Sequence, residues 1–224
     1  MTKNLLHAVT TARAVTDKVT VLFSGGKDSV CTLDLCRRFF PAQNVKAAFM
    51  YYVRGLSFQD QILDYYEKLY DMEIIRVPHF ELSSFFRYGV LRPPDESVPN
   101  LKTAEVYDYI RELTGTYWLA GGERINDSMV RRAMIKRSGS IDRSRGRFYP
   151  LAEWSKSDVM EYIKKQHLKT SPESAVLGFS FRSLNDSEMM KIKQYYPEDY
   201  ERIKRWFPLL DVTLNRYGGI EANG

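Results

Sequence analysis

The stretch that decides the fold is Val19-Thr20-Val21-Leu22-Phe23-Ser24-Gly25-Gly26-Lys27-Asp28-Ser29. Its first five residues are β-branched or apolar and predict a strand, and residues 30–40 have a helical pattern. Two adjacent glycines allow the backbone to approach an anion closely. The unpaired amides and the dipole at the start of the helix attract negative charge. The stretch therefore predicts a phosphate-binding loop, with Ser24, Lys27 and Ser29 as additional donors.

The spacing of this loop differs from the common nucleotide-binding motifs. It matches neither Gly-x-x-x-x-Gly-Lys-Ser/Thr nor Gly-x-Gly-x-x-Gly. It resembles the PP-loop, Ser-Gly-Gly-x-Asp-Ser, of the N-type ATP pyrophosphatases and of the adenylylsulfate and phosphoadenylylsulfate reductases. In that superfamily the loop holds pyrophosphate or its equivalent, and ATP is cut between its α and β phosphates.

Strands and helices alternate around the loop. Apolar runs and helical periods predict strands at 45–52, 73–77 and 116–120 and helices at 59–70 and 104–113. This order indicates an α/β fold with a doubly wound, mainly parallel sheet and helices on both faces. The resemblance implies the same fold, that of the adenine nucleotide α-hydrolases.

Other segments carry weaker local signals. Residues 84–100, with three prolines, are expected to be an irregular loop. A helix capped by Asn126 is expected to run to about Arg137, with Met129 and Val130 facing inward. We expect a nucleotide-binding α/β domain over residues 1–165 and a short helical C-terminal extension over 166–224, packed on the same domain.

Three further segments resemble the phosphoadenylylsulfate reductase branch of the superfamily. They are Trp118-Leu-Ala-Gly121-Gly122-Glu123-Arg124 with Ser128 and Arg131 downstream, Tyr149-Pro150-Leu-Ala-Glu-Trp154-Ser-Lys-Ser-Asp158-Val159-Met-Glu-Tyr162-Ile163, and Tyr196-Pro-Glu-Asp-Tyr200. Together with the loop, the resemblance covers about residues 19–165. For Trp154 and Asp158 the expected roles are structural: the indole packs and the carboxylate caps a helix.

The resemblance also implies a set of site residues. In a doubly wound sheet, ligands lie beyond the carboxyl ends of the strands. The backbone near Tyr51, Tyr52 and Val53 is expected to contact adenine, and Gly121 and Gly122 let the chain pass close to the ribose and α-phosphate. The loop residues Ser24, Gly25, Gly26, Lys27, Asp28 and Ser29 bind the phosphates of ATP. The expected catalytic residues are Lys27, Asp28, Arg124 and Arg131, and Asp28 is the expected Mg²⁺ ligand.

The cysteines of this chain differ from those of the reductases that it resembles. Phosphoadenylylsulfate reductases use a cysteine in a C-terminal Glu-Cys-Gly-Ile-His segment, whereas this sequence has no cysteine after Cys36. Cys31 and Cys36 lie roughly 140° apart around one predicted helix. We expect them to pack as small apolar residues that form neither a disulfide nor a zinc site. A thiol-based reductase that acts alone is therefore disfavoured.

Three functions stay open at this point. The favoured one is an ATP pyrophosphatase or adenylyltransferase that yields AMP and pyrophosphate and activates an acceptor, as in nucleic-acid modification. The second is a reductase or sulfotransfer-type enzyme for an adenylylated sulfate, using the thiol of a partner protein. The third is a non-catalytic ATP-binding assembly subunit. The sequence identifies neither the acceptor nor the oligomeric state.

The positive charge of the chain is concentrated in one segment. Residues 124–147 contain eight Lys or Arg and two Asp, a net charge of +6, whereas the whole chain carries +5. Such a block binds the phosphates of a nucleotide or of a nucleic acid, or is a solvated surface. Arg143, Arg145 and Arg147 alternate with Ser144 and Gly146. They are expected to face an external nucleic-acid or protein partner.

Hydropathy argues against a membrane protein. No apolar run is long enough to span a bilayer, and the first residues lack the apolar core of a signal peptide. The sequence predicts a cytoplasmic protein without a membrane partner.

Overall fold

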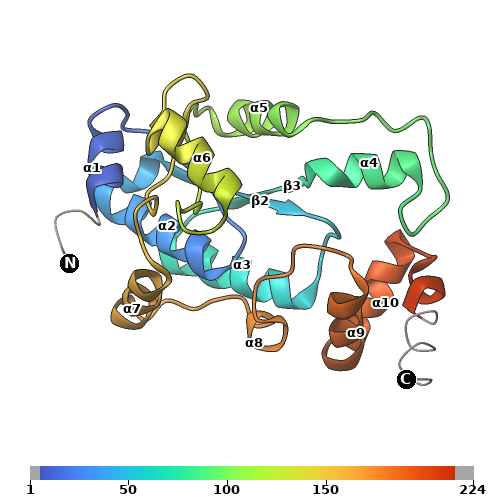
Figure 1. Cartoon of the computed structure of the whole chain (residues 1–224). Coiled ribbons are helices and arrows are strands. Elements are labelled where there is room, and N and C mark those ends of the chain that lie inside the picture. The colour runs from blue at the N-terminus through green and yellow to red at the C-terminus, as the bar shows by residue number, and fades with distance from the viewer. Residues whose placement is uncertain (1–5, 215–224) are drawn as a thin grey trace.

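A mainly parallel sheet forms the centre of the computed structural model, which describes residues 6–214 (Figure 1). Within these residues the sheet has six strands in the order β3-β2-β1-β4-β6-β5. They are β1 (Val19–Leu22), β2 (Val45–Tyr51), β3 (Ile74–Pro78), β4 (Leu119–Ala120), β5 (Ile141–Asp142) and β6 (Arg147–Phe148). Only the pairing of β5 with β6 is antiparallel in this sheet. The predicted α/β fold is confirmed.

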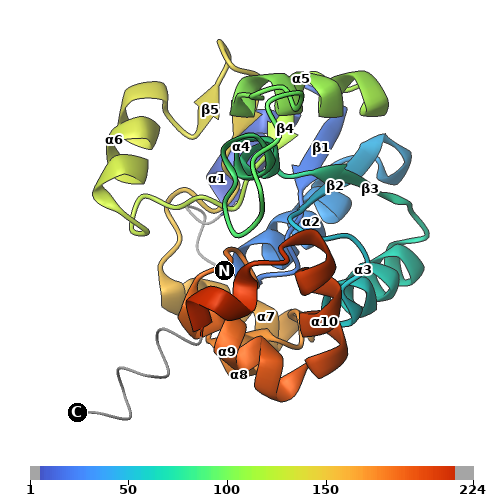
Figure 2. The ribbon, with the colours of Figure 1, turned by 90° about the vertical axis from the view of Figure 1, so that its right-hand side faces the viewer.

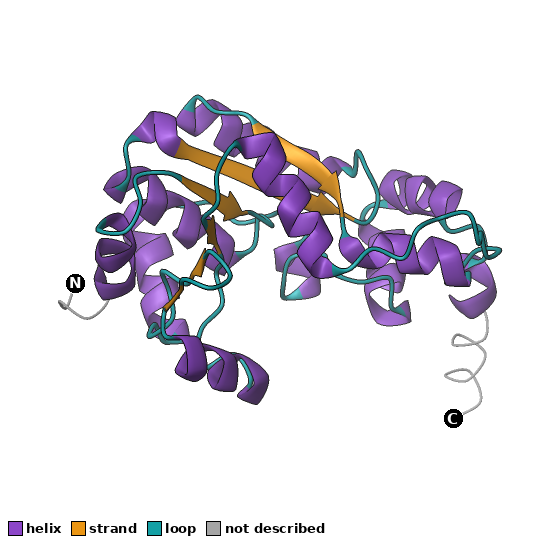
Figure 3. Ribbon diagram, turned by 90° about the horizontal axis from the view of Figure 1, so that it is seen from above, coloured by secondary structure: helices purple, strands orange, loops and turns teal. Residues whose placement is uncertain are grey.

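Helices cover both faces of the sheet (Figure 3). The helices are α1 (His7–Arg13), α2 (Lys27–Phe39), α3 (Ser57–Tyr70), α4 (Phe80–Tyr88), α5 (Thr103–Thr114), α6 (Met129–Ser138), α7 (Lys156–Gln166), α8 (Ser174–Leu177), α9 (Asp186–Tyr195) and α10 (Pro197–Trp206), with a 3₁₀ helix at Ala42–Asn44, and not all of them lie on a face of the sheet. Neighbouring strand residues point to opposite faces. Accordingly, Ala47 packs in a core cluster with α1, α2 and α3, and Ala48 packs in a second cluster with Val106 and Ile110 of α5.

The strand order reverses at β1, which lies between β2 and β4. Both neighbours are parallel to β1, so the three carboxyl ends lie at one edge of the sheet. In doubly wound folds this switch point is where ligands bind. The glycine loop follows β1, and Gly121 follows β4 directly, so the fold brings these two predicted segments to the switch point.

The C-terminal helices lie beyond this same edge (Figure 1). Buried residues of α9 and α10, including Met189, Ile192 and Ile203, share a core cluster with Tyr52 and Val53, which follow β2. The predicted division into 1–165 and 166–224 stays a prediction, and its outermost residues, 1–5 and 215–224, lie outside the described part.

Three local predictions are wrong. Residues 84–88 belong to α4, so the irregular segment begins only at Gly89, whose left-handed conformation ends this helix. Ser128 rather than Asn126 caps α6, and its Oγ accepts a hydrogen bond from the Arg131 amide. Met129 and Val130 are 85% and 79% exposed instead of facing inward, because α6 packs on the domain through Ile135 and Met134.

Within residues 6–214, no helix is both long enough and apolar enough to cross a membrane.

Candidate functional site

The glycine loop is held closed by its own serines. Gly25 has a φ of +72°, a left-handed conformation that favours glycine, and a Cβ there would lie 2.8 Å from Ile62 Cγ2. The buried Ser29 hydroxyl donates to the Gly26 carbonyl at 2.9 Å and accepts from the Ser24 amide at 3.1 Å. This hydroxyl therefore shapes the loop, and its predicted contact with a phosphate stays a prediction.

The start of α2 is arranged as an anion site. Gly26 is the N-cap and offers no side chain to cap the helix. The first amides of α2 are therefore available as donors, and the helix dipole adds partial positive charge. The ammonium of Lys27 is ion-paired with the neighbouring Asp28 carboxylate, and both side chains are partly exposed.

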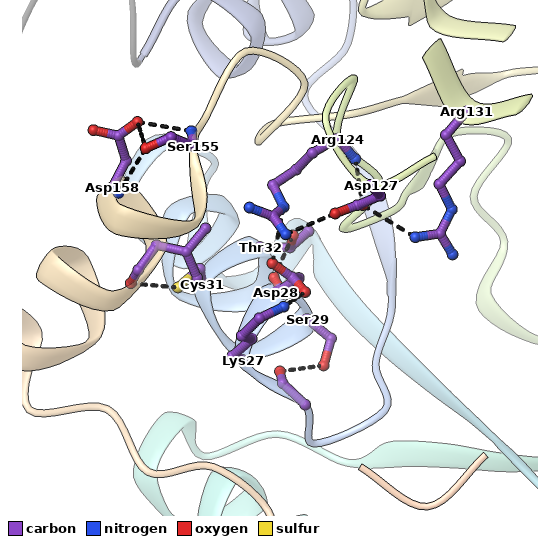
Figure 4. Close-up of polar contacts among 12 residues, drawn as sticks. Lys27, Asp28, Ser29, Cys31, Thr32, Arg124, Asp127, Arg131, Ser155 and Asp158 are labelled. Carbon is purple, nitrogen blue, oxygen red and sulfur yellow. Dashed lines mark hydrogen bonds and ion pairs between the residues drawn. The ribbon is translucent and has the colours of Figure 1, made fainter. Parts of the chain in front are cut away.

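Arg124 reaches this helix start from the loop after β4 (Figure 4). It is 5% exposed. Its Nε lies 3.2 Å from Asp28 Oδ1, and its Nη2 donates to Asp127 Oδ1 at 2.6 Å. Its remaining nitrogen, Nη1, is buried and has no hydrogen-bond partner within residues 6–214. A buried guanidinium is thus held on two sides by carboxylates, and both N–H donors of its Nη1 are left without a partner.

Asp127 links Arg124 to the surface. Its other oxygen, Oδ2, accepts from Arg131 Nη1 at 3.0 Å, and the Arg131 side chain is half exposed. The structure therefore brings together Lys27, Asp28, Arg124 and Arg131, which are the four predicted catalytic residues. The sequence did not indicate the bridging role of Asp127, although its position three residues after one arginine and four before the other was a usable signal.

Gly122 allows the loop after β4 to pack on α2. A Cβ at this position would lie 3.0 Å from the backbone carbon of Asp28, closer than ordinary contacts. A Cβ on Gly121 would meet the Glu123 carboxylate. In the structure, the atoms that lie close to these two glycines belong to other residues of the chain. The predicted contact of both glycines with ribose stays a prediction.

Two serines from the C-terminal segment also lie against the loop. The Ser171 amide donates to the Gly25 carbonyl at 2.9 Å, and Ser180 Oγ lies 2.7 Å from where a Cβ of Gly26 would be. Buried Glu173 ties this segment together, because it bonds the Ser171 hydroxyl and accepts from the Phe181 amide. Burial raises the pKa of this carboxyl. Sequence reasoning missed these residues because the contacts are long-range.

The last residue of β2 and the two that follow it have mostly structural side chains. Tyr52 and Val53 are buried in the cluster with the C-terminal helices, and Tyr51 lies edge-on to Trp206. The Tyr51 carbonyl accepts from the His79 amide at 2.8 Å. The side chains of this segment are thus used in packing, and only its free backbone groups are available to adenine. The predicted adenine contact stays a prediction.

The predicted position of Arg147 is wrong. It was expected on a loop facing a partner, but it lies in β6 and is 9% exposed. Its Nη2 donates to Glu123 Oε1 at 2.7 Å, and its guanidinium lies 4.8 Å from the ring centroid of Tyr107. The hairpin of β5 and β6 turns this side chain inward, whereas Arg143 and Arg145, in the turn of the hairpin, are exposed.

Cys31 and Cys36 are free and buried, as expected. Burial, together with the charges of Asp28 and Asp34, raises the pKa of the Cys31 thiol to about 12. Burial also raises the pKa of Cys36. The predicted structural roles of Trp154 and Asp158 are confirmed too, since the indole is buried and the carboxylate forms a capping box with Ser155.

A glycine loop after β1 and an arginine after β4, meeting at the switch point of a parallel sheet, define a PP-loop α/β domain. Residues 18–172 match the model of the phosphoadenosine phosphosulfate reductase domain. The chain belongs to this family.

The chain is also similar to a curated protein and, in its fold, to two solved structures. The chain is 23% identical to sulfate adenylyltransferase subunit 2 of Streptomyces lavendulae over 176 residues, which cover 68% of this chain and 55% of the relative. It thus spans about half the length of that curated relative.

Both solved structures share the fold. One is the NH3-dependent NAD synthetase of Campylobacter jejuni in complex with nitrate, at 17% identity and a TM-score of 0.51, covering 96% of this chain and 92% of that one. The other is the phosphoadenylyl-sulfate reductase of Candida auris in complex with phosphate, at 15% identity and a TM-score of 0.54, covering 80% and 87%.

Proposed function

We propose that the chain binds ATP at the glycine loop, cleaves it between the α and β phosphates, and transfers the adenylyl group to an acceptor. The observation that carries this proposal is the buried Arg124 guanidinium with its unpartnered Nη1. Leaving a buried cationic donor unpaired costs free energy. An anion at the ends of β1 and β4 removes that cost, and the α-phosphate of ATP has the required charge.

The reaction needs no protein nucleophile. An acceptor oxygen attacks the α-phosphorus, the bond from that phosphorus to the bridging oxygen breaks, and pyrophosphate leaves with the electron pair. The first amides of α2 and the ammonium of Lys27 stabilise the leaving pyrophosphate, and Arg124 and Arg131 stabilise the charge on the α-phosphate. The high thiol pKa of Cys31 agrees with a reaction in which the two cysteines take no part.

Asp28 fits the role of the protein ligand for Mg²⁺. Its Oδ1 is buried and accepts no hydrogen bond within residues 6–214, and its contact with Arg124 Nε is an ion pair at 3.2 Å. Magnesium bound with substrate phosphates takes only one or two carboxylates. The described residues contain no group of three His, Cys, Asp or Glu suited to a metal, which agrees with a metal held mainly by phosphates. When bound, Mg²⁺ neutralises charge on the phosphates.

We also propose that turnover depends on a partner protein. The curated relative that the chain resembles is named as a subunit. A partner could provide the acceptor site, or the thiol that a sulfate-reducing activity requires. An ATP-binding assembly subunit without turnover is the remaining alternative.

Analysis of the nucleotides tests this function. The purified chain is incubated with ATP, Mg²⁺ and candidate acceptors, and the products are separated by anion-exchange chromatography. We expect AMP and pyrophosphate from the chain and neither product from an Arg124→Gln variant. ADP and orthophosphate as the sole products would contradict the proposed cleavage. Tighter binding of adenosine phosphosulfates than of ATP would favour the reductase alternative, and ATP binding without turnover would favour the subunit.

A further inference from the structure

An exposed basic surface lies beside the nucleotide site. It consists of Arg132, Lys136 and Arg137 on α6 together with Arg143 and Arg145 in the turn between β5 and β6, all of them exposed. We call these five residues the basic face. Figure 2 shows α6 at the outer edge of the molecule, next to β5. The sequence predicts that part of this charge lies on a loop that includes Arg147. In the structure Arg147 is buried, and residues of α6 contribute to the exposed charge.

The last turn of α6 and the hairpin turn line one hollow. Its walls include the arginines 137, 143 and 145 and the hydroxyls of Ser138 and Ser144. The carboxylate in this hollow, Asp142, is already ion-paired, although its Oδ2 accepts no hydrogen bond within residues 6–214. It accepts from the Ser144 hydroxyl at 2.6 Å and from the Arg145 amide at 3.1 Å, and it pairs with Arg145 Nε at 2.9 Å. The hollow therefore presents the guanidinium donors of Arg137 and Arg143 to an anion, whereas its two hydroxyls donate within the chain.

Most cations of the basic face have no acidic partner. Within residues 6–214, Arg132, Lys136, Arg137 and Arg143 form no ion pair. Their charges extend along a helix and a neighbouring turn, which suits a ligand with repeated negative charges better than a single phosphate group. Guanidinium groups also suit the oxygens of phosphodiesters, because their planar fork binds two of them at once.

The first turn of α6 adds apolar groups to this surface. Met129 and Val130, next to the basic face in sequence, are the most exposed of the large apolar residues in the described part. Apolar side chains beside cations match a nucleic acid, which offers sugars and base faces next to its phosphates.

A short ionic path joins this surface to the nucleotide site. Arg131 lies on α6 with the basic face and shares Asp127 with the buried Arg124, which in turn pairs with Asp28 at the start of α2. A polymer that follows α6 toward its first turn therefore arrives at the arginine that borders the predicted α-phosphate position.

We propose that the basic face binds the phosphodiester backbone of a nucleic acid, with one phosphate in the hollow between α6 and the hairpin. The same polymer carries the acceptor group to the ATP site. This acceptor role rests on the proposed function, whereas the binding itself does not.

The salt dependence of nucleic-acid binding tests the proposal on the full chain. Fluorescein-labelled single-stranded RNA and duplex DNA of mixed sequence are titrated by fluorescence anisotropy at several salt concentrations. The variant Arg137→Gln/Arg143→Gln removes two unpaired cations of the hollow. The control Lys164→Gln/Lys165→Gln removes two exposed cations at the end of α7 and changes the net charge equally.

We expect the wild-type chain to bind at least one probe. In the hollow variant, the slope of log affinity against log salt should fall by about 0.7 for single-stranded RNA or about 0.9 for duplex DNA, the contribution of one phosphate. The control should keep the wild-type slope, and both variants should keep their ATP affinity and melting temperature. Absence of binding to both probes at low salt would overturn the proposal, as would equal slopes for the two variants. Nucleic-acid binding without ATP binding would instead contradict only the proposed function.

Discussion

The glycine loop and the arginine-rich segment 124–147 differ in how their structure arises. The loop is shaped by contacts among six consecutive residues, above all the Ser29 hydroxyl bonded to Gly26 and Ser24. In the arginine-rich segment, similar side chains have opposite environments: Arg124 and Arg147 are buried against carboxylates, and Arg143 is exposed. The structure of a motif that is held by local contacts can be predicted largely from its own residues. In a charged segment, by contrast, the fold decides which side chains are buried and which are exposed.

The largest effect is expected at Arg124. Arg124→Gln leaves the carboxylates of Asp28 and Asp127 without their shared cation, and breaking a buried ion pair costs about 3 to 5 kcal/mol. Urea denaturation should show a loss of this order, together with a loss of ATP binding. Arg131→Gln, a surface partner of the same Asp127, should cost less than about 1 kcal/mol. Equal losses in the two variants would contradict the division between buried and surface arginines.

A smaller effect separates the two arginines of the hairpin. Arg147→Gln leaves Glu123, which is partly buried, without its ionic partner, and should lower the free energy of unfolding by about 1 to 3 kcal/mol. Arg143→Gln, in the exposed turn, should change it by no more than about 0.5 kcal/mol. Both values come from urea denaturation monitored by circular dichroism. If the Arg143 variant were the less stable one, the inward placement of Arg147 would be wrong.

Much of the fold could be predicted because its signals are local. The apolar run of β1, the loop, and the capping box of Ser155 and Asp158 involve neighbouring residues, and their structures agree with the prediction. The environment of Arg147 and the position of Ser180 depend on contacts with distant segments, which periodicity does not report. The start of α6 was misplaced because Asn126 and Ser128 are both residues that favour an N-cap position.

The smallest effect is expected at the cysteines. The pKa of Cys31, raised to about 12, leaves almost no thiolate at pH 7 to 9. Iodoacetamide should therefore label neither thiol of the folded chain across this range, and both thiols after unfolding in urea, as counted by mass spectrometry. The Cys31→Ala/Cys36→Ala variant should retain ATP binding and turnover. Rapid labelling of the folded chain, or a folded variant that binds ATP without turnover, would restore a thiol-based mechanism.

The ATP affinity of a Lys27→Ala variant tests the central claim most directly. Lys27 and Lys156 are both partly or fully exposed lysines at the first position of a helix, so Lys156→Ala is the matched control. Loss of one charge-assisted bond, about 1.5 to 3 kcal/mol, weakens binding by roughly ten-fold or more. Isothermal titration calorimetry with ATP and Mg²⁺ should show this loss for Lys27→Ala and wild-type affinity for Lys156→Ala. Unchanged affinity in Lys27→Ala would contradict the assignment of the glycine loop as the phosphate site.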